Sequence, residues 1–508
     1  MALVRRPIGT AILLALVFGP AAAVAAPAGL SAHDTALINR ITWGANASSA
    51  AEFKRLGARK WLDAQLHPTA DDGLPDPIRA EIEALPVVRT PVAELVVNTS
   101  AESHAAKLMV DTEMKDKAKH AVKDELVRYA QQAAARSMLR DIYSRNQLKE
   151  QMNWFWLNHF NVDIRKANVR GMIGDYEERA IRPYALGRFR DLLGATVQHP
   201  AMLRYLDNAE NTRGHANENY ARELMELHTL GVGSGYTQKD VQELARILTG
   251  VGIDIGHDDP RLPPNQQGLL VRAGLFEFNP QRHDFGDKVF LGHVIKGRGY
   301  AEVEEALDIL ARDPATARHV SRQLAVYFVG DSPSEALVDS MARTFRRSDG
   351  NIAEVLKTLF ASHEFDQSLG KSFKDPMHYA ISAVRLAYDG RVVGETHPIE
   401  GWLAEMGQPL YLHETPDGYP MTSAAWNAPG QIASRFAVAR QLGGPSQLVR
   451  AEDIGPGGVR PLPGFQQAAY EGGVGQQLGV STQAVLAKSA TPQEWNALFL
   501  SSPEFMRR

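Results

Sequence analysis

The chain of 508 residues contains no cysteine. This absence excludes disulfide bonds, iron–sulfur clusters, thiolate zinc sites and cysteine nucleophiles. Basic residues are not in excess either, because the formal net charge is −4 at pH 7. A nucleic-acid-binding domain usually carries a basic patch or stripe, so we do not expect nucleic acid as a partner.

Several motifs that are typical of enzymes are also missing. The sequence has no HExxH, no ExxH pair, no GxSxG, no GxxxxGK[ST] and no GxGxxG after a predicted strand. These absences argue against zincin proteases, ferritin-like di-iron bundles, α/β-hydrolases, P-loop enzymes and Rossmann dehydrogenases. The chemistry that remains is that of Glu, Asp, His, Asn and Arg side chains.

The first residues have the pattern of a secretory leader. Arg5 and Arg6 precede an apolar run, which ends at Pro20 and is followed by small residues. We predict a leader over residues 1–25, a periplasmic or secreted location and no transmembrane segment after cleavage. Removing the leader changes the net charge from −4 to −6, because it takes away two positive charges and no negative one. A twin-arginine export route and an uncleaved anchor stay open, although the run barely reaches the ~18–20 apolar residues of a span.

The rest of the chain predicts a mainly α protein. We expect a short linker over 26–34 and a single large helical body over 35–508. The only strands expected are those of a small β-hairpin near 274–292, where apolar and polar residues alternate on both sides of a turn-forming centre. Residues 101–151 interleave Lys and Glu, which indicates a long exposed helix or helical hairpin.

Two local signals predict where helices begin. Ser49 and Glu52 have the spacing of a capping box, so we expect a helix that begins at Ser49 and ends at Pro68. Asp313-Pro314 combines a capping side chain with a proline that suits the first position of a helix.

Polar residues gather in one predicted helix, Asn217–Gly231. At about 100° per residue, one face of it carries a polar stripe that spans roughly 140°. The members of this stripe are Glu218, Asn219, Arg222, Glu223 and Glu226. One interpretation is a salt-bridged surface face. The other is a catalytic wall, because crowded carboxylates raise one another's pKa when they are buried.

A second notable stretch is NWFWLNHFNVD, residues 153–163. As a helix it is apolar on every side, which indicates burial. Asn158 and His159 would then be buried polar groups that need hydrogen-bond partners. They either hold helices together or belong to an aromatic-walled pocket for a polar ligand such as a sugar.

Further candidates lie later in the chain. His283 and Asp284 are expected at the tip of the β-hairpin, where a histidine beside carboxylates can act as a general base or ligate a metal. A polar turn would have the same composition. Trp426 precedes Asn427-Ala428-Pro429, the expected start of a helix, and is an aromatic candidate for lining a site.

Five stretches resemble a known family. In chain order they are NWFWLNHFNVD, RPYALGRFRDLLGATVQHPAMLRYLDN, NENYARELMELHTLGVGSGYTQKDVQELARILTG, HDFGDKVFLG and MGQPLYLHETPDGYP with AWNAPG. Over about residues 35–506, the chain resembles the bacterial exported family catalogued as domain of unknown function 1800. The resemblance implies an exported, mostly helical protein, often encoded beside a second exported family that resembles the sulfatase/alkaline-phosphatase superfamily. It implies no reaction, and His228 stands where the family often has an aromatic residue.

These observations lead to three hypotheses. The first is an exported hydrolase that uses carboxylate acid–base chemistry on an extracellular polymer such as a glycan. Its catalytic residues would come from Glu218, Glu223, Glu226 and Asp284, and its substrate-binding residues from Asn158, His159, Asn219, Arg222, His283 and Trp426. The second is a non-catalytic partner or assembly factor for an exported protein encoded nearby. The third is a metal-dependent enzyme that uses His159, His283 and carboxylates; the sequence identifies no cofactor.

Overall fold

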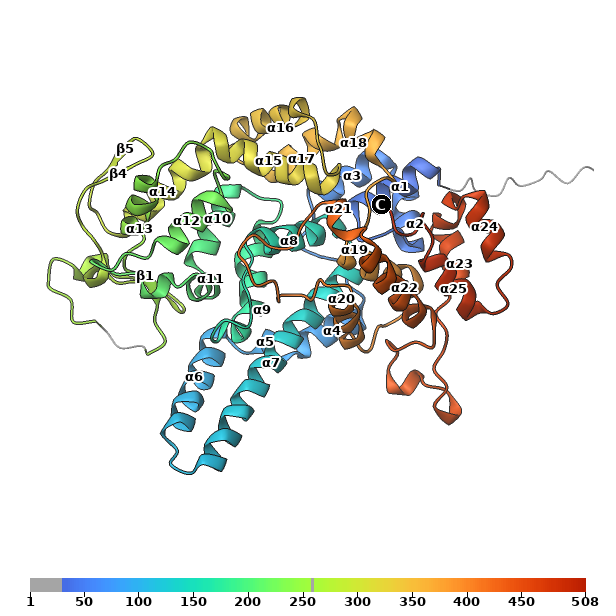
Figure 1. The fold of residues 1–508 in the computed structure, drawn as a ribbon, viewed down its shortest axis with the longest axis horizontal. Helices are drawn as coiled ribbons and strands as arrows, with labels where there is room; N and C mark the ends of the chain where they lie inside the picture. Colours follow the sequence, from blue (N-terminus) through green and yellow to red (C-terminus); the bar gives the residue numbers. More distant parts are fainter. Residues whose placement is uncertain (1–29, 257–259) are drawn as a thin grey trace, which may run out of the picture.

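The computed structural model describes residues 30–256 and 260–508, so the predicted leader lies outside the described residues. Within these ranges the chain forms 25 α-helices and five short strands, which confirms the mainly α class. The first helix begins at Ala32, inside the segment expected as a linker. The buried apolar side chains form one main cluster that extends from Leu30 to Met506 (Figure 1).

The N-terminal helices pack against the middle of the body. They are α1 (Ala32–Ile41), α2 (Ala47–Leu56), α3 (Ala58–Leu66), α4 (Asp76–Ala84) and α5 (Pro86–Arg89). The single helix expected from Ser49 to Pro68 is therefore wrong. The side chain of Asn46 caps α2 by accepting from the Ser49 amide, and Gly57, at φ 75°, separates α2 from α3. A glycine adopts this conformation without strain, which lets the chain turn between two helices.

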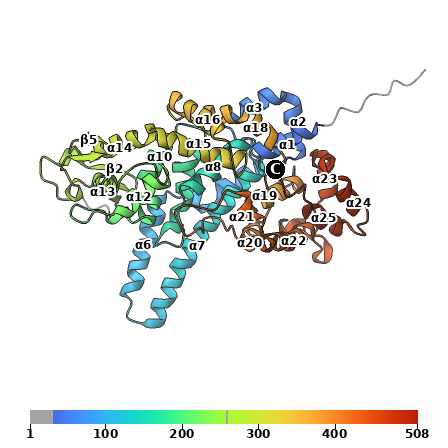
Figure 2. The same ribbon diagram turned by 45° about the horizontal axis from the view of Figure 1, so that its top comes forward.

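The next two helices form an arm. The helices α6 (Val92–Leu108) and α7 (Thr112–Tyr143) pack against each other and project from the body in both views (Figures 1 and 2). Of the two arrangements expected from the charge pattern of residues 101–151, a long exposed helix or a helical hairpin, the structure has the hairpin. Only the later part of α7, from Ala130 onward, is deeply buried.

The central helices surround the aromatic stretch. They are α8 (Gln147–His159), α9 (Ile173–Asp175), α10 (Phe189–Gln198), α11 (Pro200–Tyr205), α12 (Glu218–Glu226) and α13 (Gln238–Ile247). All residues of α8 except Lys149 are buried, as expected of a helix that is apolar on every side. At the start of α13, Thr237 and Asp240 form a reciprocal capping box.

Five strands form two small antiparallel sheets. They are β1 (Val251–Ile253), β2 (Val271–Ala273), β3 (Phe276–Phe278), β4 (Lys288–Phe290) and β5 (His293–Ile295). The single expected hairpin would pair β3 with β4, but β3 pairs with β1 and β2, and β4 pairs with β5. Leu291 and Gly292 both have positive φ in the two-residue β4–β5 turn, a geometry that favours pairing of immediate neighbours.

The remaining helices complete the body. They are α14 (Tyr300–Arg312), α15 (Pro314–Phe328), α16 (Glu335–Arg347), α17 (Ile352–Phe360), α18 (His363–Ser368), α19 (Pro376–Ala387), α20 (His397–Glu405), α21 (Ser423–Trp426), α22 (Pro429–Gly443), α23 (Phe465–Glu471), α24 (Val480–Leu486) and α25 (Pro492–Leu500). The expected start of α15 is confirmed, because Asp313 caps the helix and Pro314 is its first residue. A long irregular segment links α20 to α21.

A buried carboxylate ties this irregular segment to two helices. Glu177 accepts hydrogen bonds from the Ser137 hydroxyl of α7 (2.7 Å) and from the Asn153 amide of α8 (2.6 Å). Its other oxygen accepts from the Tyr411 hydroxyl at 2.5 Å. A buried charge needs such a full set of donors, because removing it from water costs several kcal/mol.

We predict that Glu177→Ala lowers the free energy of unfolding by about 3 kcal/mol, because it leaves three buried donors without their acceptor. Urea denaturation measures this loss. Glu83→Ala, at an exposed position of α4, is the control and should change stability by no more than about 0.5 kcal/mol. Equal effects of the two substitutions would contradict the assignment.

Candidate functional site

The acidic stripe lies on α12, as its spacing predicts. The side chain of Asn217 caps the helix by accepting from the Asn219 amide. The opposite face of the helix is buried and consists of Tyr220, Ala221, Leu224 and Met225. This apolar face anchors α12 in the core and leaves the stripe half-exposed.

Most of the stripe is paired. Glu218 accepts a hydrogen bond from Gln238 at 2.6 Å, and Arg222 donates to the same Gln238 at 2.7 Å. Arg222 also lies 3.6 Å from both Glu218 and Glu226. Glu218, Arg222 and Glu226 therefore form the salt-bridged surface face that is one of the two interpretations of the sequence pattern.

Glu223 differs from its neighbours on the same stripe. It is half-buried, and among the described residues its carboxylate takes part in no hydrogen bond or ion pair. Burial raises the pKa of Glu223, and the charge of Glu226 raises it further, while Arg222 opposes the shift. A half-buried carboxyl group without a partner is able to gain and lose a proton without breaking a structural contact.

Glu223 opens onto a polar cleft of about 570 Å³. The cleft lies between α12, the end of α11, the chain after α8 and the irregular segment before α21. It is lined by Asp163, Arg165, Lys166, Tyr205, Leu206, Asp207, Asn219, Glu223, Glu414 and Pro416. Two predicted site residues, Asn219 and Glu223, thus share one cavity.

A second carboxylate lines the same cleft. Asp163 is buried and accepts from Arg165 Nε at 3.0 and 3.1 Å. The Tyr205 hydroxyl donates to the Glu414 carbonyl at 2.7 Å. Burial raises the pKa of Tyr205, and the negative charges of Asp163 and Glu223 raise it further, so both carboxylates act on one phenol.

Two predicted substrate-binding residues instead hold the irregular segment. Asn158 donates to the Tyr419 carbonyl at 2.9 Å and accepts from the Tyr419 amide at 2.7 Å. Gly418 has φ 71°, and a Cβ there would lie 2.2 Å from the Asn158 carbonyl oxygen, so only glycine fits. Trp426 is buried and donates to the Pro420 carbonyl at 2.8 Å. Their visible role is to position the wall of the cleft.

His159 belongs to a buried group of three histidines. Its Nε2 donates to the His228 carbonyl at 3.1 Å, and its ring centre lies 6.0 Å from that of His228 and 6.1 Å from that of His319. Burial lowers the pKa of His159 to about 3, so the ring is neutral at physiological pH. Among the residues that the structure describes, none forms a hydrogen bond with the buried Nε2 atom of His228.

His283 is fully buried, although the sequence pattern predicts it at an exposed turn. Its Nδ1 contacts the Thr249 carbonyl at 2.7 Å, and its Nε2 lies 2.9 Å from Glu302. Glu302 also pairs with the buried Lys288. Burial alone would raise the pKa of Glu302, but the hydrogen bonds from His283 and Lys288 outweigh this effect and lower it.

Asp284 does not line the cleft that contains Glu223. Its two oxygens accept from Arg246 at 2.8 and 3.2 Å. These hydrogen bonds, together with smaller contributions, lower the pKa of Asp284 to about 2. The structure thus gives Asp284 a structural partner and does not bring it to the acidic stripe.

The described part of the chain contains no cluster of three or more His, Asp or Glu side chains that could hold a metal ion. His159 and His283, which were considered together as ligands, lie in two separate buried sites with different partners. Sequence reasoning missed Asp163, Tyr205 and Glu414 as site residues. Their only signal was the position of Asp163 at the end of NWFWLNHFNVD and of Glu414 within LHETPDGYP.

We predict that Glu223→Gln raises stability at high pH. Because the folded protein raises the pKa of Glu223 above its unfolded value of about 4.3, the free energy of unfolding falls as pH rises from the unfolded pKa through the raised pKa. A glutamine at this position has no charge to titrate, so the variant does not lose this stability as pH rises. We expect a gain of roughly 0.5 kcal/mol at pH 8 and almost none at pH 4, measured by urea denaturation. Glu218→Gln is the control, because Glu218 has partners; an equal gain there would contradict the interpretation.

In the described ranges, no helix combines the length and the apolar character that crossing a membrane requires. Neither the curated proteins nor the solved structures contain a match to this chain. The family described as "Protein of unknown function (DUF1800)" matches residues 36–507, which is nearly the whole described chain. The chain therefore belongs to the DUF1800 family.

Proposed function

We propose that the protein is an exported hydrolase that acts on a polar extracellular or periplasmic polymer such as a glycan. The observation that carries the proposal is the position of Glu223, an unpaired, half-buried carboxyl group with a raised pKa in a polar cleft. A raised pKa keeps a carboxyl group protonated closer to neutral pH, where it can act as a general acid. The pattern of residues 1–25 supports export.

Asp163 supplies the second carboxylate that glycoside hydrolysis requires. Glu223 donates its proton to the glycosidic oxygen as the bond from that oxygen to the anomeric carbon breaks. Asp163 accepts a proton from the attacking water as the water oxygen bonds to the anomeric carbon. Arg165 donates two hydrogen bonds to Asp163 and so fixes the orientation of its carboxylate. Exchange with solvent then returns a proton to Glu223 and removes one from Asp163.

We predict that the purified protein releases reducing ends from at least one member of a panel of soluble glycans. Glu223→Gln should lower kcat by about 100-fold or more with little change in KM, because it removes the transferred proton and keeps the shape. Activity should fall as pH rises through the raised pKa of Glu223. Reducing-end assays across pH measure both effects.

The control for this experiment is Glu218→Gln, on the same face of α12. Its carboxylate is occupied by Gln238 and Arg222, so we expect kcat within about threefold of the unmodified protein. Retention of full activity by Glu223→Gln, or a panel without any cleaved glycan, would overturn the proposal.

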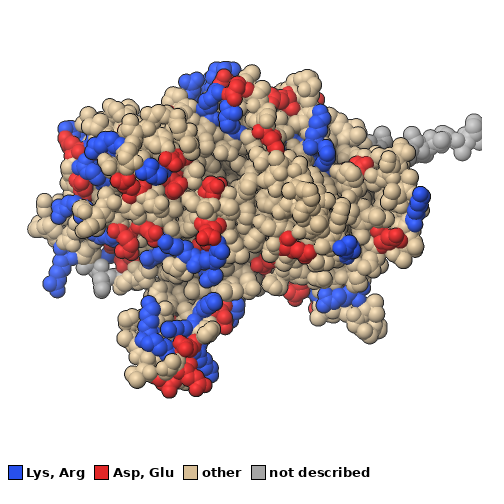
Figure 3. All heavy atoms as spheres, in the orientation of Figure 1, with Lys and Arg blue, Asp and Glu red and all other residues tan. Residues whose placement is uncertain are grey.

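A second candidate function is supported by the arm. The turn between α6 and α7 exposes large apolar side chains, and that of Val110 is 98% exposed. The apolar tip consists of Leu108, Met109, Val110 and Met114. Figure 3 shows acidic and basic side chains side by side on the arm, which gives the tip a charged surround without one dominant sign. Exposed apolar groups in such a surround are typical of protein contacts, and we propose the exported protein encoded nearby as the partner.

We predict that Leu108→Ser combined with Val110→Ser reduces co-purification of that neighbouring protein by at least tenfold. Both side chains are exposed, so the thermal unfolding midpoint should stay unchanged. The matched control is Val289→Ser with Val294→Ser, an exposed apolar pair on β4 and β5. Undiminished co-purification by the tip variant would exclude the arm as the contact.

A further inference from the structure

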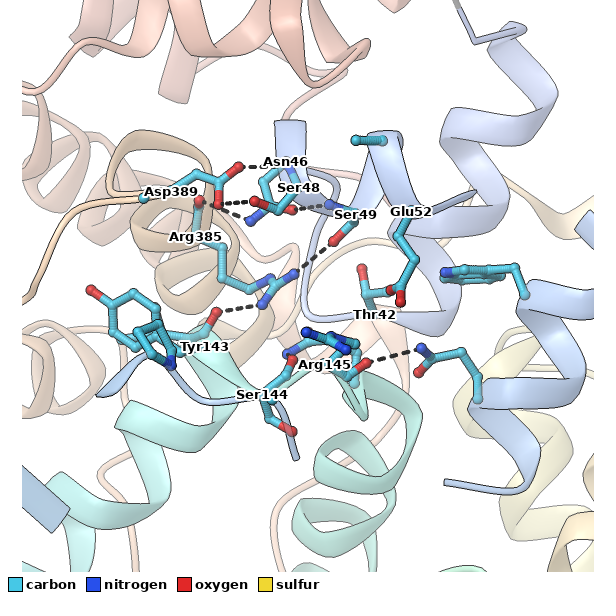
Figure 4. Close-up of a pocket in the computed structure, with 18 of the residues that line it drawn as sticks. Thr42, Asn46, Ser48, Ser49, Glu52, Tyr143, Ser144, Arg145, Arg385 and Asp389 are labelled. Carbon is cyan, nitrogen blue, oxygen red and sulfur yellow. Dashed lines mark hydrogen bonds between the residues drawn. The ribbon is translucent and has the colours of Figure 1, made fainter. Parts of the chain in front are cut away.

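A second polar cavity, of about 540 Å³, lies away from the cleft of Glu223. Residues of the α1–α2 turn, α2, α3, the end of α7 and α19 enclose it (Figure 4). In both ribbon views, α2 and α19 lie on the opposite side of α8 from α12. The lining residues of the two cavities do not overlap.

A buried arginine forms part of the wall of this cavity. Arg385 is 3% exposed and donates to the carbonyls of Gly44 and Ile142 and, at 3.0 Å, to the Ser49 hydroxyl. All of these acceptors are neutral. Burial lowers the pKa of Arg385 to about 10, while Asp389 and Asp141 act on it only through their fields. The guanidinium therefore places a positive charge beside the cavity without a directly bonded carboxylate.

The carboxylate of Asp389 is not available to bond directly to Arg385, because Ser48 occupies it. One of its oxygens accepts from the Ser48 amide at 2.7 Å, and the other accepts from the Ser48 hydroxyl at 2.7 Å. These contacts satisfy the Ser48 amide and hydroxyl in the first turn of α2. The Ser49 hydroxyl accepts from Arg385, and in the described chain its own hydrogen is donated to no acceptor. Ser49 is thus a donor available at the cavity wall.

A second arginine reaches the same cavity from its rim. The guanidinium of Arg145 lies across Gly73, where a Cβ would be 2.9 Å from Arg145 Nε. Gly73 also has φ 64°, so a larger residue there would be strained and would displace the arginine. No hydrogen bond or ion pair occupies this guanidinium in the part of the chain that the structure describes, and Arg145 and Arg385 both line the cavity (Figure 4).

An acidic side chain faces the two arginines. Glu52, on α2, points into the same space from the other side (Figure 4). Its ion-pair partner is Arg55, at 3.8 Å, and the side chain of Arg55 is 68% exposed. An ion pair of this length with an exposed arginine contributes little energy, so Glu52 is available to a ligand.

We propose that this cavity binds a small zwitterion that carries one carboxylate and one ammonium group, namely a free amino acid or a dipeptide. The carboxylate accepts from Arg145 and from the Ser49 hydroxyl, in the positive field of Arg385. The ammonium group donates to Glu52. Trp61 is buried behind the cavity wall and packs on Phe53, which keeps this part of the wall in place. The volume is in the range of small-molecule sites and accommodates a dipeptide.

Isothermal titration calorimetry of the purified full chain tests this proposal with L-alanine, L-alanyl-L-alanine and two blocked dipeptides. We expect saturable binding of at least one zwitterion. N-acetylation removes the ammonium group and C-amidation removes the carboxylate, and each should weaken binding of L-alanyl-L-alanine by at least tenfold.

Two variants assign the ends of the ligand. Arg145→Gln should abolish the preference for the dipeptide over its amide but keep the preference over the N-acetyl form. Glu52→Gln should have the reverse effect. Both side chains lie at or near the surface, so these variants are expected to fold. Arg346→Gln, at an exposed position of α16, is the control and should leave both preferences unchanged.

If neither L-alanine nor L-alanyl-L-alanine binds, the proposal is overturned. Equal binding of the dipeptide and its amide would also overturn it. Binding of inorganic phosphate alone would identify a simple anion site and would also overturn it. These outcomes are independent of the hydrolase proposal, because neither Arg145 nor Glu52 lines the cleft of Glu223.

Discussion

The buried carboxylate of Glu177 is the point at which α7, α8 and the irregular segment before α21 are joined. A charge in the core is tolerated only while its donors remain in place, which fixes the three elements relative to one another. Each of them carries residues of the proposed sites: α7 forms one side of the arm, α8 is followed by Asp163, and the irregular segment supplies Glu414. The geometry of the cleft therefore depends on a contact that lies outside it.

The fold was predictable where the signals are local. The all-round apolar pattern of α8 and the Asp313-Pro314 start of α15 depend on neighbouring residues alone, and both predictions are confirmed. The break at Gly57 and the pairing of β3 were missed for a different reason. Whether a helix ends at Gly57 or continues past it, and which strand pairs with β3, both depend on how the surrounding helices and strands pack. The local sequence pattern does not contain that information.

The candidate site was predictable only in part. The helical periodicity places Glu218, Glu223 and Glu226 on one face of α12, and the structure confirms this position. Periodicity does not indicate which of the three carboxylates is paired and which is free. Gln238 and Tyr205, which belong to other elements, decide which carboxylate is occupied and which adjoins the cleft. The same limit applies to His283. Thr249 and Glu302 reach it from both sides and convert an expected surface turn into a buried ion cluster.

The continuity of α7 has a mechanical consequence. The helix has 32 residues, so it extends for about 48 Å as one rod. It begins two residues after Val110 and ends at Tyr143, which lines the cavity beside Arg145. A load that tilts the exposed end must also move the cavity wall, unless the helix bends. By thermodynamic reciprocity, a ligand that stiffens the wall would then resist the tilt. The buried segment of α7, from Ala130 onward, thus couples the position of the exposed arm to that of the cavity wall.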